Sequence, residues 1–206
     1  MRLLLHVCCA GCACYPLKKL RQVRVEEKDL EITGFWYNPN IHPYSEYQNR
    51  MMTMGYFSQK EKLPMIWKDE YALEEWLEAT RGKFDLPVHS AGQGRTPLSW
   101  KKEKRCEKCY DLRLEKLAKE AKEGGYDYFS TTLLYSKFQE HEIIKRICEK
   151  LRNEYNISFY YANFRVGWKE GIEISKKMDL YRQHYCGCIF SEKEKRQQIK
   201  IDEKRI

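Results

Sequence analysis

Five short apolar segments recur along the chain and alternate with segments whose apolar residues follow helical spacing. Buried strands are expected at residues 3–7, 30–37, 63–67, 128–134 and 157–162. Helices are expected at residues 15–24, 45–62, 71–79, around 114–121 and around 143–151. The alternation predicts an α/β fold: a parallel β-sheet with helices on both faces, the three-layer arrangement of Rossmann-like and HUP-like proteins.

The same pattern predicts one domain with a charged tail. Residues 1–190 contain all the predicted strands and are enough to bury a core, so they are expected to form a single α/β catalytic domain. Within it, residues 81–110 begin with a stretch rich in Gly, Pro and polar residues, which predicts an inserted loop region that carries function. Residues 191–206 are rich in Lys, Glu and Arg and are expected to form a solvated helix or a frayed end.

Charge and composition narrow the class of partner. The chain of 206 residues has 38 Lys and Arg against 30 Asp and Glu, a formal charge of +8 that favours a polyanionic partner such as nucleic acid. Its 15 Tyr and 5 Trp suit stacking on unpaired bases, although core packing explains such rings equally well. No apolar run approaches the roughly 20 residues of a membrane span, and no signal peptide is apparent. A cytoplasmic protein without a membrane partner is expected.

The cysteines are the strongest chemical signal. Nine are present, an odd number that excludes complete internal pairing, and a reducing cytoplasm disfavours structural disulfides. Cys148 lies among apolar residues of a predicted helix and is interpreted as core packing. The other eight form three clusters: Cys8, Cys9, Cys12 and Cys14; Cys106 and Cys109; Cys186 and Cys188.

Two of these clusters suit a metal centre. The segment CCAGCAC follows the first strand, and ligands of open α/β sheets bind beyond the carboxyl ends of the strands. Cys106 and Cys109 have cationic neighbours, which favour the thiolate form that binds metal. The loop after the first strand could supply one pair of thiolates and Cys106 with Cys109 the other, which gives four thiolates around one centre at this edge. Such a donor set suits zinc or an iron-sulfur cluster, and the spacing does not decide between them.

The remaining pair and a nearby acid have more than one interpretation. Cys186 and Cys188 are separated by one glycine, so a disulfide between them would be strained and easily reduced. This predicts a redox pair, with further metal ligation as the alternative. Asp111 is a candidate proton donor, a candidate metal ligand or a plain surface residue of a helix.

Polar side chains follow two predicted strands and could line a substrate site at the same edge of the sheet. The segment YNPNIHPYSEYQNR follows the second strand, and STTLLYSKFQEHE ends the fourth. A turn with an ordinary helix cap explains either segment as well. The candidate substrate-binding residues are Asn38, Asn40, His42, Tyr47, Arg50, Thr131, Thr132 and Gln139.

The motifs LLLHVCCAGC, YNPNIHPYSEY, RCEKCYDLRL, FSTTLLYS and YRQHYCGC, taken together, span residues 3–188. In these motifs the chain resembles the non-cobalamin epoxyqueuosine reductases, the QueH family. The resemblance implies an enzyme that reduces epoxyqueuosine, at the wobble position of the tRNA anticodon loop, to queuosine with loss of water, the last step of queuosine biosynthesis. It also implies an external electron donor.

Residue roles follow from the matching motif positions. The resemblance implies that Cys8, Cys9, Cys106 and Cys109 hold a [4Fe-4S] cluster. It implies that Cys186 and Cys188 form a redox-active disulfide. Cys12 and Asp111 are candidate ligands of an additional iron ion, because both lie beside cluster ligands in the sequence.

Proton delivery and RNA binding have their own candidates. Asp111 and His42 are the candidate proton donors for the departing epoxide oxygen. Arg165, Lys169, Arg182 and the basic residues around 101–105 are expected to hold tRNA phosphates. Two other interpretations are kept: a non-catalytic, zinc-stabilised RNA-binding protein, and a thiol oxidoreductase that acts on small molecules.

Overall fold

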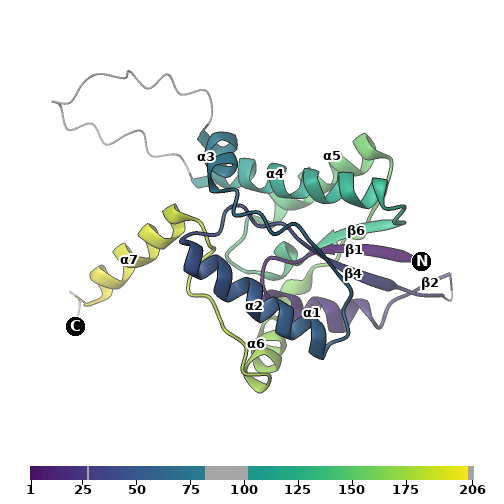
Figure 1. Cartoon of the computed structure of the whole chain (residues 1–206), viewed down its shortest axis with the longest axis horizontal. Coiled ribbons are helices and arrows are strands. Elements are labelled where there is room, and N and C mark those ends of the chain that lie inside the picture. Colours follow the sequence, from purple (N-terminus) through teal and green to yellow (C-terminus); the bar gives the residue numbers. More distant parts are fainter. Residues whose placement is uncertain (27, 82–101, 204–206) are drawn as a thin grey trace.

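A parallel five-stranded sheet forms the centre of the molecule (Figure 1). The computed structural model describes residues 1–26, 28–81 and 102–203. The strand order is β5-β4-β1-β6-β7, and each neighbouring pair is parallel. The strands are β1 (Arg2–His6), β4 (Glu31–Trp36), β5 (Met65–Trp67), β6 (Tyr128–Thr131) and β7 (Ser158–Phe159).

Helices cover both faces of this sheet (Figure 1). One face carries α1 (Ala10–Leu20), α2 (Tyr44–Lys60) and α6 (Trp168–Lys177). The other carries α3 (Leu73–Arg81), α4 (Lys102–Glu123) and α5 (His141–Tyr155). The predicted α/β fold with a parallel sheet between helical layers is therefore confirmed.

Smaller elements complete the described chain. The structure has two short 3-10 helices, η1 (Thr132–Tyr135) and η2 (Phe164–Gly167), and an antiparallel hairpin of β2 (Arg24–Val25) and β3 (Lys28–Asp29). The last helix, α7 (Ile189–Glu203), extends away from the sheet (Figure 1). No helix in the part of the chain that the structure describes is long and apolar enough to span a membrane.

Several predicted boundaries differ from the observed ones for local reasons. The fourth strand ends at Thr131 rather than at residue 134, because the Thr131 hydroxyl accepts the Leu133 N–H and starts η1. The first helix begins at Ala10 rather than at residue 15, because Cys9 is its N-cap. Of the predicted loop region, residues 102–110 are the start of α4, and residues 82–101 lie outside the described part. The hairpin and α6 were not predicted.

The strand order determines where a ligand can bind. β1 is central, and its Leu3, Leu4 and Leu5 are fully buried, as expected for a strand covered on both faces. The chain leaves β1 towards β4 on one side, whereas it leaves β6 towards β7 on the other. The crevice between the carboxyl ends of β1 and β6 is therefore the topological switch point of the sheet.

A candidate thiol-lined active site

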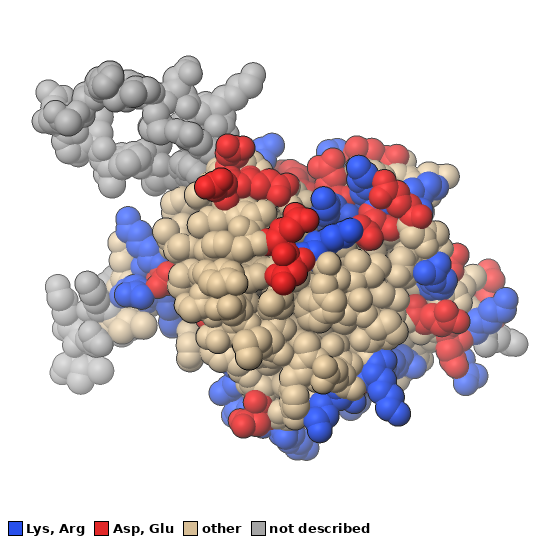
Figure 2. Space-filling model, viewed as in Figure 1, with Lys and Arg blue, Asp and Glu red and all other residues tan. Residues whose placement is uncertain are grey.

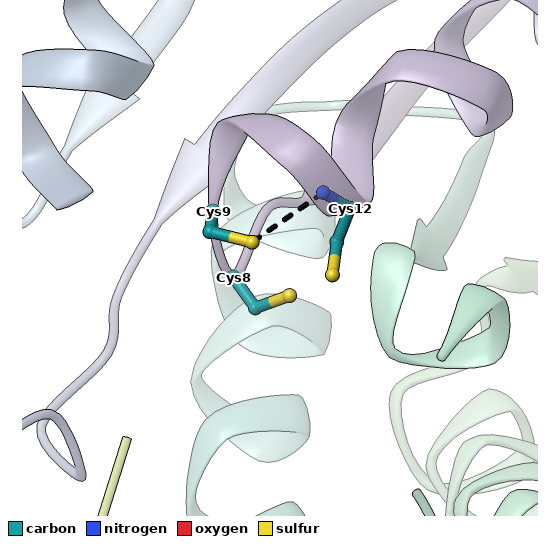
Figure 3. A group of neighbouring side chains, drawn as sticks. All are labelled: Cys8, Cys9 and Cys12. Carbon is teal, nitrogen blue, oxygen red and sulfur yellow. Dashed lines mark hydrogen bonds between the residues drawn. The ribbon is translucent and has the colours of Figure 1, made fainter. Parts of the chain in front are cut away.

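Three cysteine side chains meet at this switch point, at the N-terminus of α1 (Figure 3). Cys9 is the N-cap, and its sulfur accepts the Cys12 N–H at 3.4 Å. The Sγ atoms of Cys8, Cys9 and Cys12 lie within 4.8 Å of one another, the one such group of potential metal ligands among the described residues. The helix start therefore directs the three sulfur atoms toward one point.

Within the group of three, hydrogen bonding favours the thiolate form at Cys8. Hydrogen bonds from Cys12 and from Cys9 hold the pKa of Cys8 well below its usual range, and the Thr132 hydroxyl donates a further bond at 3.4 Å. The hydrogen bonds with Cys8 and with Cys9, followed by burial, raise the pKa of Cys12. Metal binding requires cysteine ligands to lose their protons, and the lowered pKa makes Cys8 the thiol of the three that loses its proton most readily.

A fourth side chain, from a distant part of the chain, completes this group. The Gln183 amide donates to the Cys9 sulfur at 2.8 Å and to the Cys12 sulfur at 3.6 Å. Soft sulfur donors, partly buried and supported by N–H groups, fit the thiolate-preferring centres, namely zinc and iron-sulfur clusters. The cysteines near the carboxyl end of β1 therefore form a candidate metal site, as the sequence predicted.

A cavity of about 660 Å³ opens beside the three thiols. Its walls come from the start of α1, from η1 and the turn after it, from α6, and from the segment that leads into α7. Cys8, Cys12 and Cys186 line it together with the side chains of Gln139 and Arg182. The fold thus brings the first and third cysteine clusters to the same space.

The two cysteines of the third cluster have different environments. Cys186 is half-buried and lines the cavity, whereas Cys188 is buried against Trp76 and Cys109. Gly187 between them has φ of +125°, a conformation that other residues rarely adopt, and a Cβ there would lie 3.1 Å from the Arg50 guanidinium. The glycine therefore permits the turn that separates a cavity-facing thiol from a buried one.

Hydrogen bonding makes Cys186 the thiolate of this pair. The hydrogen bond from Cys188 lowers the pKa of Cys186; burial opposes this shift, and the Gln139 N–H, at 3.5 Å, adds to it. The same bond raises the pKa of Cys188. Gln139 is itself oriented by the Tyr110 hydroxyl, which donates to its carbonyl oxygen at 2.7 Å. A nucleophilic sulfur thus faces the cavity, with its protonated partner behind it.

The second cysteine cluster lies on α4, outside the group of three thiols. Cys109 is buried, and the Arg113 guanidinium lies 4.0 Å from its sulfur. Burial raises the pKa of Cys106 and of Cys109, and the negative charge of Cys186 raises both further. The predicted convergence of Cys106 and Cys109 with Cys8 and Cys9 on one cluster therefore stays a prediction.

Arg113 and His6 form a buried polar network under the site, which the sequence analysis missed. Arg113 donates to the side-chain oxygen Oδ1 of Asn38 at 2.7 Å and lies 3.4 Å from the His6 ring. Burial, followed by the charge of Arg113, lowers the pKa of His6 to about 3, so this histidine is neutral. The charge of Arg113 adds to the hydrogen bonds that lower the pKa of Cys8, and it partly offsets the burial that raises the pKa of Cys109. In the sequence, the feature that could have indicated a role for Arg113 is its position one helical turn after Cys109.

Eight of the predicted substrate-binding residues fall into two groups. Asn40, Arg50, Gln139 and Arg182 line the cavity. The other group does not line the cavity and bonds to other parts of the protein, with Asn38 bonded to the Val7 carbonyl and Thr131 to His6. Thr132 also belongs to this group through its bonds to Cys8, and the Tyr47 hydroxyl bonds to Trp36 and Asp69. Of this second group, Thr132 contacts a cysteine of the site directly.

The remaining candidates do not line the cavity. The His42 ring bonds to the Tyr71 hydroxyl at 3.0 Å, and its backbone N–H donates to the Gly187 carbonyl. Asp111 has Lys108, Lys150 and two glutamates as charged neighbours, and its carboxylate does not join the three thiols. Arg165 donates to Asn163 and does not line the cavity. The roles of these residues as proton donors, second-iron ligand and phosphate contact stay predictions.

An α/β protein with clustered thiols at its switch point and a second, polarised pair facing the same cavity belongs to the thiol- or metal-dependent redox class. Comparison with protein families agrees: the model described as "Epoxyqueuosine reductase QueH" matches residues 3–194. The chain belongs to this family and is an oxidoreductase. The resemblance noted from the sequence motifs is thereby confirmed.

Relatives of the chain carry the same description. An epoxyqueuosine reductase QueH of Dehalococcoides mccartyi is 34% identical over 194 residues, 94% of each chain. One of Thermotoga maritima is 36% identical over 208 residues, 98% of this chain and 96% of the relative. One of Helicobacter pylori is 32% identical, over 92% of this chain and 49% of the relative, so the family includes longer proteins.

Proposed function

We propose that the protein reduces epoxyqueuosine to queuosine in the anticodon loop of tRNA, as the last step of queuosine biosynthesis. Family membership supports the reaction. The observation that carries the proposal is the cavity in which the sulfur atoms of Cys8 and Cys12 and the polarised sulfur of Cys186 face the same space. A metal-binding group and a redox dithiol on one cavity suit a reaction that breaks carbon–oxygen bonds by reduction.

The electron balance explains why a dithiol is needed. Removing the epoxide oxygen as water breaks two C–O bonds, forms a C=C bond, and consumes two electrons and two protons. Oxidation of Cys186 and Cys188 to a disulfide releases two electrons, and the two protons come from the Cys188 thiol and from solvent. An external reductant must then return two electrons to the disulfide, so a turnover cycle requires an electron-donating partner.

The cofactor proposed is a [4Fe-4S] cluster held by Cys8, Cys9, Cys106 and Cys109, with Cys12 and Asp111 as candidate ligands of an additional iron. Bound there, iron supplies one-electron transfer and a Lewis acid for the epoxide oxygen. The chain's own residues supply the rest: Gln183 and Thr132 hold the cysteine sulfurs in place, and Arg113 stabilises the thiolate of Cys8. Asp111 and His42 are the proposed donors that pass the proton from solvent to the epoxide oxygen.

The tRNA substrate agrees with the charge of the chain and with the cavity. An anticodon loop is single-stranded, so a base can enter the cavity without the cost of opening a duplex. Arg182 lines the cavity and is exposed, so it is the best placed of the proposed phosphate contacts. Arg165 and Lys169 would contact RNA further from the thiols.

A zinc-stabilised RNA-binding protein without catalysis is the second candidate. It is favoured by the close spacing of Cys8, Cys9 and Cys12, which would also suit a single ion. It provides no role for the polarised Cys186. Protein purified without oxygen should be brown and contain iron and sulfide under our proposal, and colourless with zinc under the alternative.

The decisive experiment measures queuosine formation on epoxyqueuosine-containing tRNA by anaerobic protein with a chemical reductant. Cys186→Ser should keep the visible absorption of the iron centre and lose turnover. Cys148→Ala, which alters a fully buried cysteine of α5, should keep both. Normal turnover by Cys186→Ser would remove the dithiol from the mechanism, and absence of turnover by iron-loaded unmodified protein would overturn the proposed function.

A further inference from the structure

An exposed phenylalanine stands at the rim of the cavity. Phe138 is 77% exposed and lines the cavity together with Trp168 and Tyr135. Its ring meets that of Trp168 edge to face, with centroids 5.8 Å apart. Trp168 in turn stacks on Tyr135 at 5.1 Å. The three rings contact one another in a row that leads from the buried Tyr135 to the exposed ring of Phe138 at the cavity.

The position of this ring is set by the turn that positions the redox pair. The Phe138 N–H donates to the Ser136 hydroxyl, and the Gln139 N–H donates to the Ser136 carbonyl. Gln139 then points its amide at Cys186, whereas Phe138, one residue earlier, points into solvent at the cavity rim. A ligand whose reacting group lies at Cys186 would therefore carry its adjacent group past Phe138.

Charge around the rings indicates what that adjacent group is. The Lys137 ammonium lies 5.9 Å from the Trp168 ring, and Lys102, Arg182 and Lys195 line the same cavity. Flat aromatic surface combined with several cations is the arrangement that binds unpaired nucleotides, since each base stacks on a ring while its phosphate meets a cation. Other strongly exposed apolar side chains, such as Met52, do not line the cavity.

We propose that Phe138, backed by Trp168, is a stacking surface for the unpaired base next to the nucleotide that is reduced. This inference rests on the proposed tRNA substrate and adds to it a specific subsite. Stacking recognises the flat face of a base and not its edge. The subsite would therefore hold the loop in position without selecting a particular base beside the reduced nucleotide.

The test uses an RNA hairpin with the sequence of an anticodon arm and 2-aminopurine beside the wobble position. The fluorescence of 2-aminopurine is quenched when the base stacks on an aromatic ring. If Phe138 only supported the local fold, replacing it would not remove this quenching. The unmodified protein should bind the hairpin and quench the 2-aminopurine fluorescence. Phe138→Ala should bind about 10-fold more weakly and lose the quenching. Phe138→Trp should keep both, and Phe138→Leu should lose the quenching.

Tyr56→Ala is the matched control, because Tyr56 is an exposed ring of α2, near a lysine, that does not line the cavity. It should bind and quench as the unmodified protein does. Full quenching and affinity in Phe138→Ala, or no hairpin binding by unmodified protein, would overturn the stacking surface. Its failure is distinguishable from that of the proposed function, because turnover of full tRNA by unmodified protein is measured separately.

Discussion

At the scale of single residues, Gln139 shows how one amide sets the chemistry of a thiol. Its N–H groups face the Cys186 sulfur because the Tyr110 hydroxyl holds the other end of the amide. Tyr110 also accepts the Glu140 N–H, so the orientation is shared with the start of α5. The sequence placed Gln139 at a substrate site, whereas the structure gives it a contact with the redox pair as well.

Gln139→Leu should raise the pKa of Cys186, because the thiolate loses a hydrogen-bond donor. The pH at half-maximal alkylation of Cys186 by iodoacetamide, followed by mass spectrometry of the reduced protein, should rise by about one unit. At pH values below the raised pKa, less thiolate is present and the alkylation is slower. An exposed glutamine of α2 gives the control, Gln48→Leu. An unchanged pH profile in Gln139→Leu would show that its amide does not stabilise the thiolate.

At the scale of elements, helix α2 holds the segment that carries the redox pair. Arg50 donates to the carbonyl groups of Tyr185 and Cys186, each at 3.0 Å, and to the Glu46 carboxylate at 2.7 Å. The Tyr181 hydroxyl donates to the same carboxylate. A buried ion pair of one helix thus binds both ends of a segment that lies more than a hundred residues further along the chain.

Arg50→Met should destabilise the fold strongly, because it leaves the buried Glu46 carboxylate without its cation. Loss of one partner of a buried ion pair costs about 3–5 kcal/mol of unfolding free energy. Urea unfolding should show this as a lower midpoint, and trypsin should cut faster after Arg182. Adding Glu46→Gln to Arg50→Met should restore part of the midpoint, since the unpaired charge is removed. Equal midpoints for the single variant and the unmodified protein would contradict this account.

At the scale of the whole molecule, charge is unevenly distributed. Figure 2 shows a face over α2 with few charged side chains, whereas Lys and Arg gather along the lower edge by α6. Residues of α6 and α7 form walls of the cavity. The net charge of +8 therefore includes cations close to the side on which an RNA loop would enter.

RNA binding should weaken steeply with salt, because phosphate contacts release counterions. For the anticodon hairpin, the logarithm of the binding constant should fall linearly with the logarithm of the salt concentration. Arg182→Gln should make this slope shallower by about 0.7, the value for one lost contact to a single strand. The control is Lys28→Gln, in the hairpin of β2 and β3 at the end of the molecule away from α7 in Figure 1. This variant should leave the slope unchanged. A binding constant that does not vary with salt would contradict phosphate contact.

Local features of the sequence determined the layers of the fold and the location of the thiols. The apolar run of β1 predicted a buried central strand, and CCAGCAC directly after it placed cysteines at the carboxyl edge. These features depend on residues near one another in the chain, so periodicity and turn chemistry are sufficient. The end of β6 was misplaced because the cap formed by Thr131 competes with an apolar run that continues to Leu134.

Only the tertiary structure decided which side chains meet. Cys12 joins Cys8 and Cys9 because the helix starts at Ala10, and Gln183 reaches them from a segment beyond α6. Arg113 enters the site because α4 packs against β1 and β6. Contacts of this kind depend on strand order and on which face each helix covers, and no local pattern encodes them.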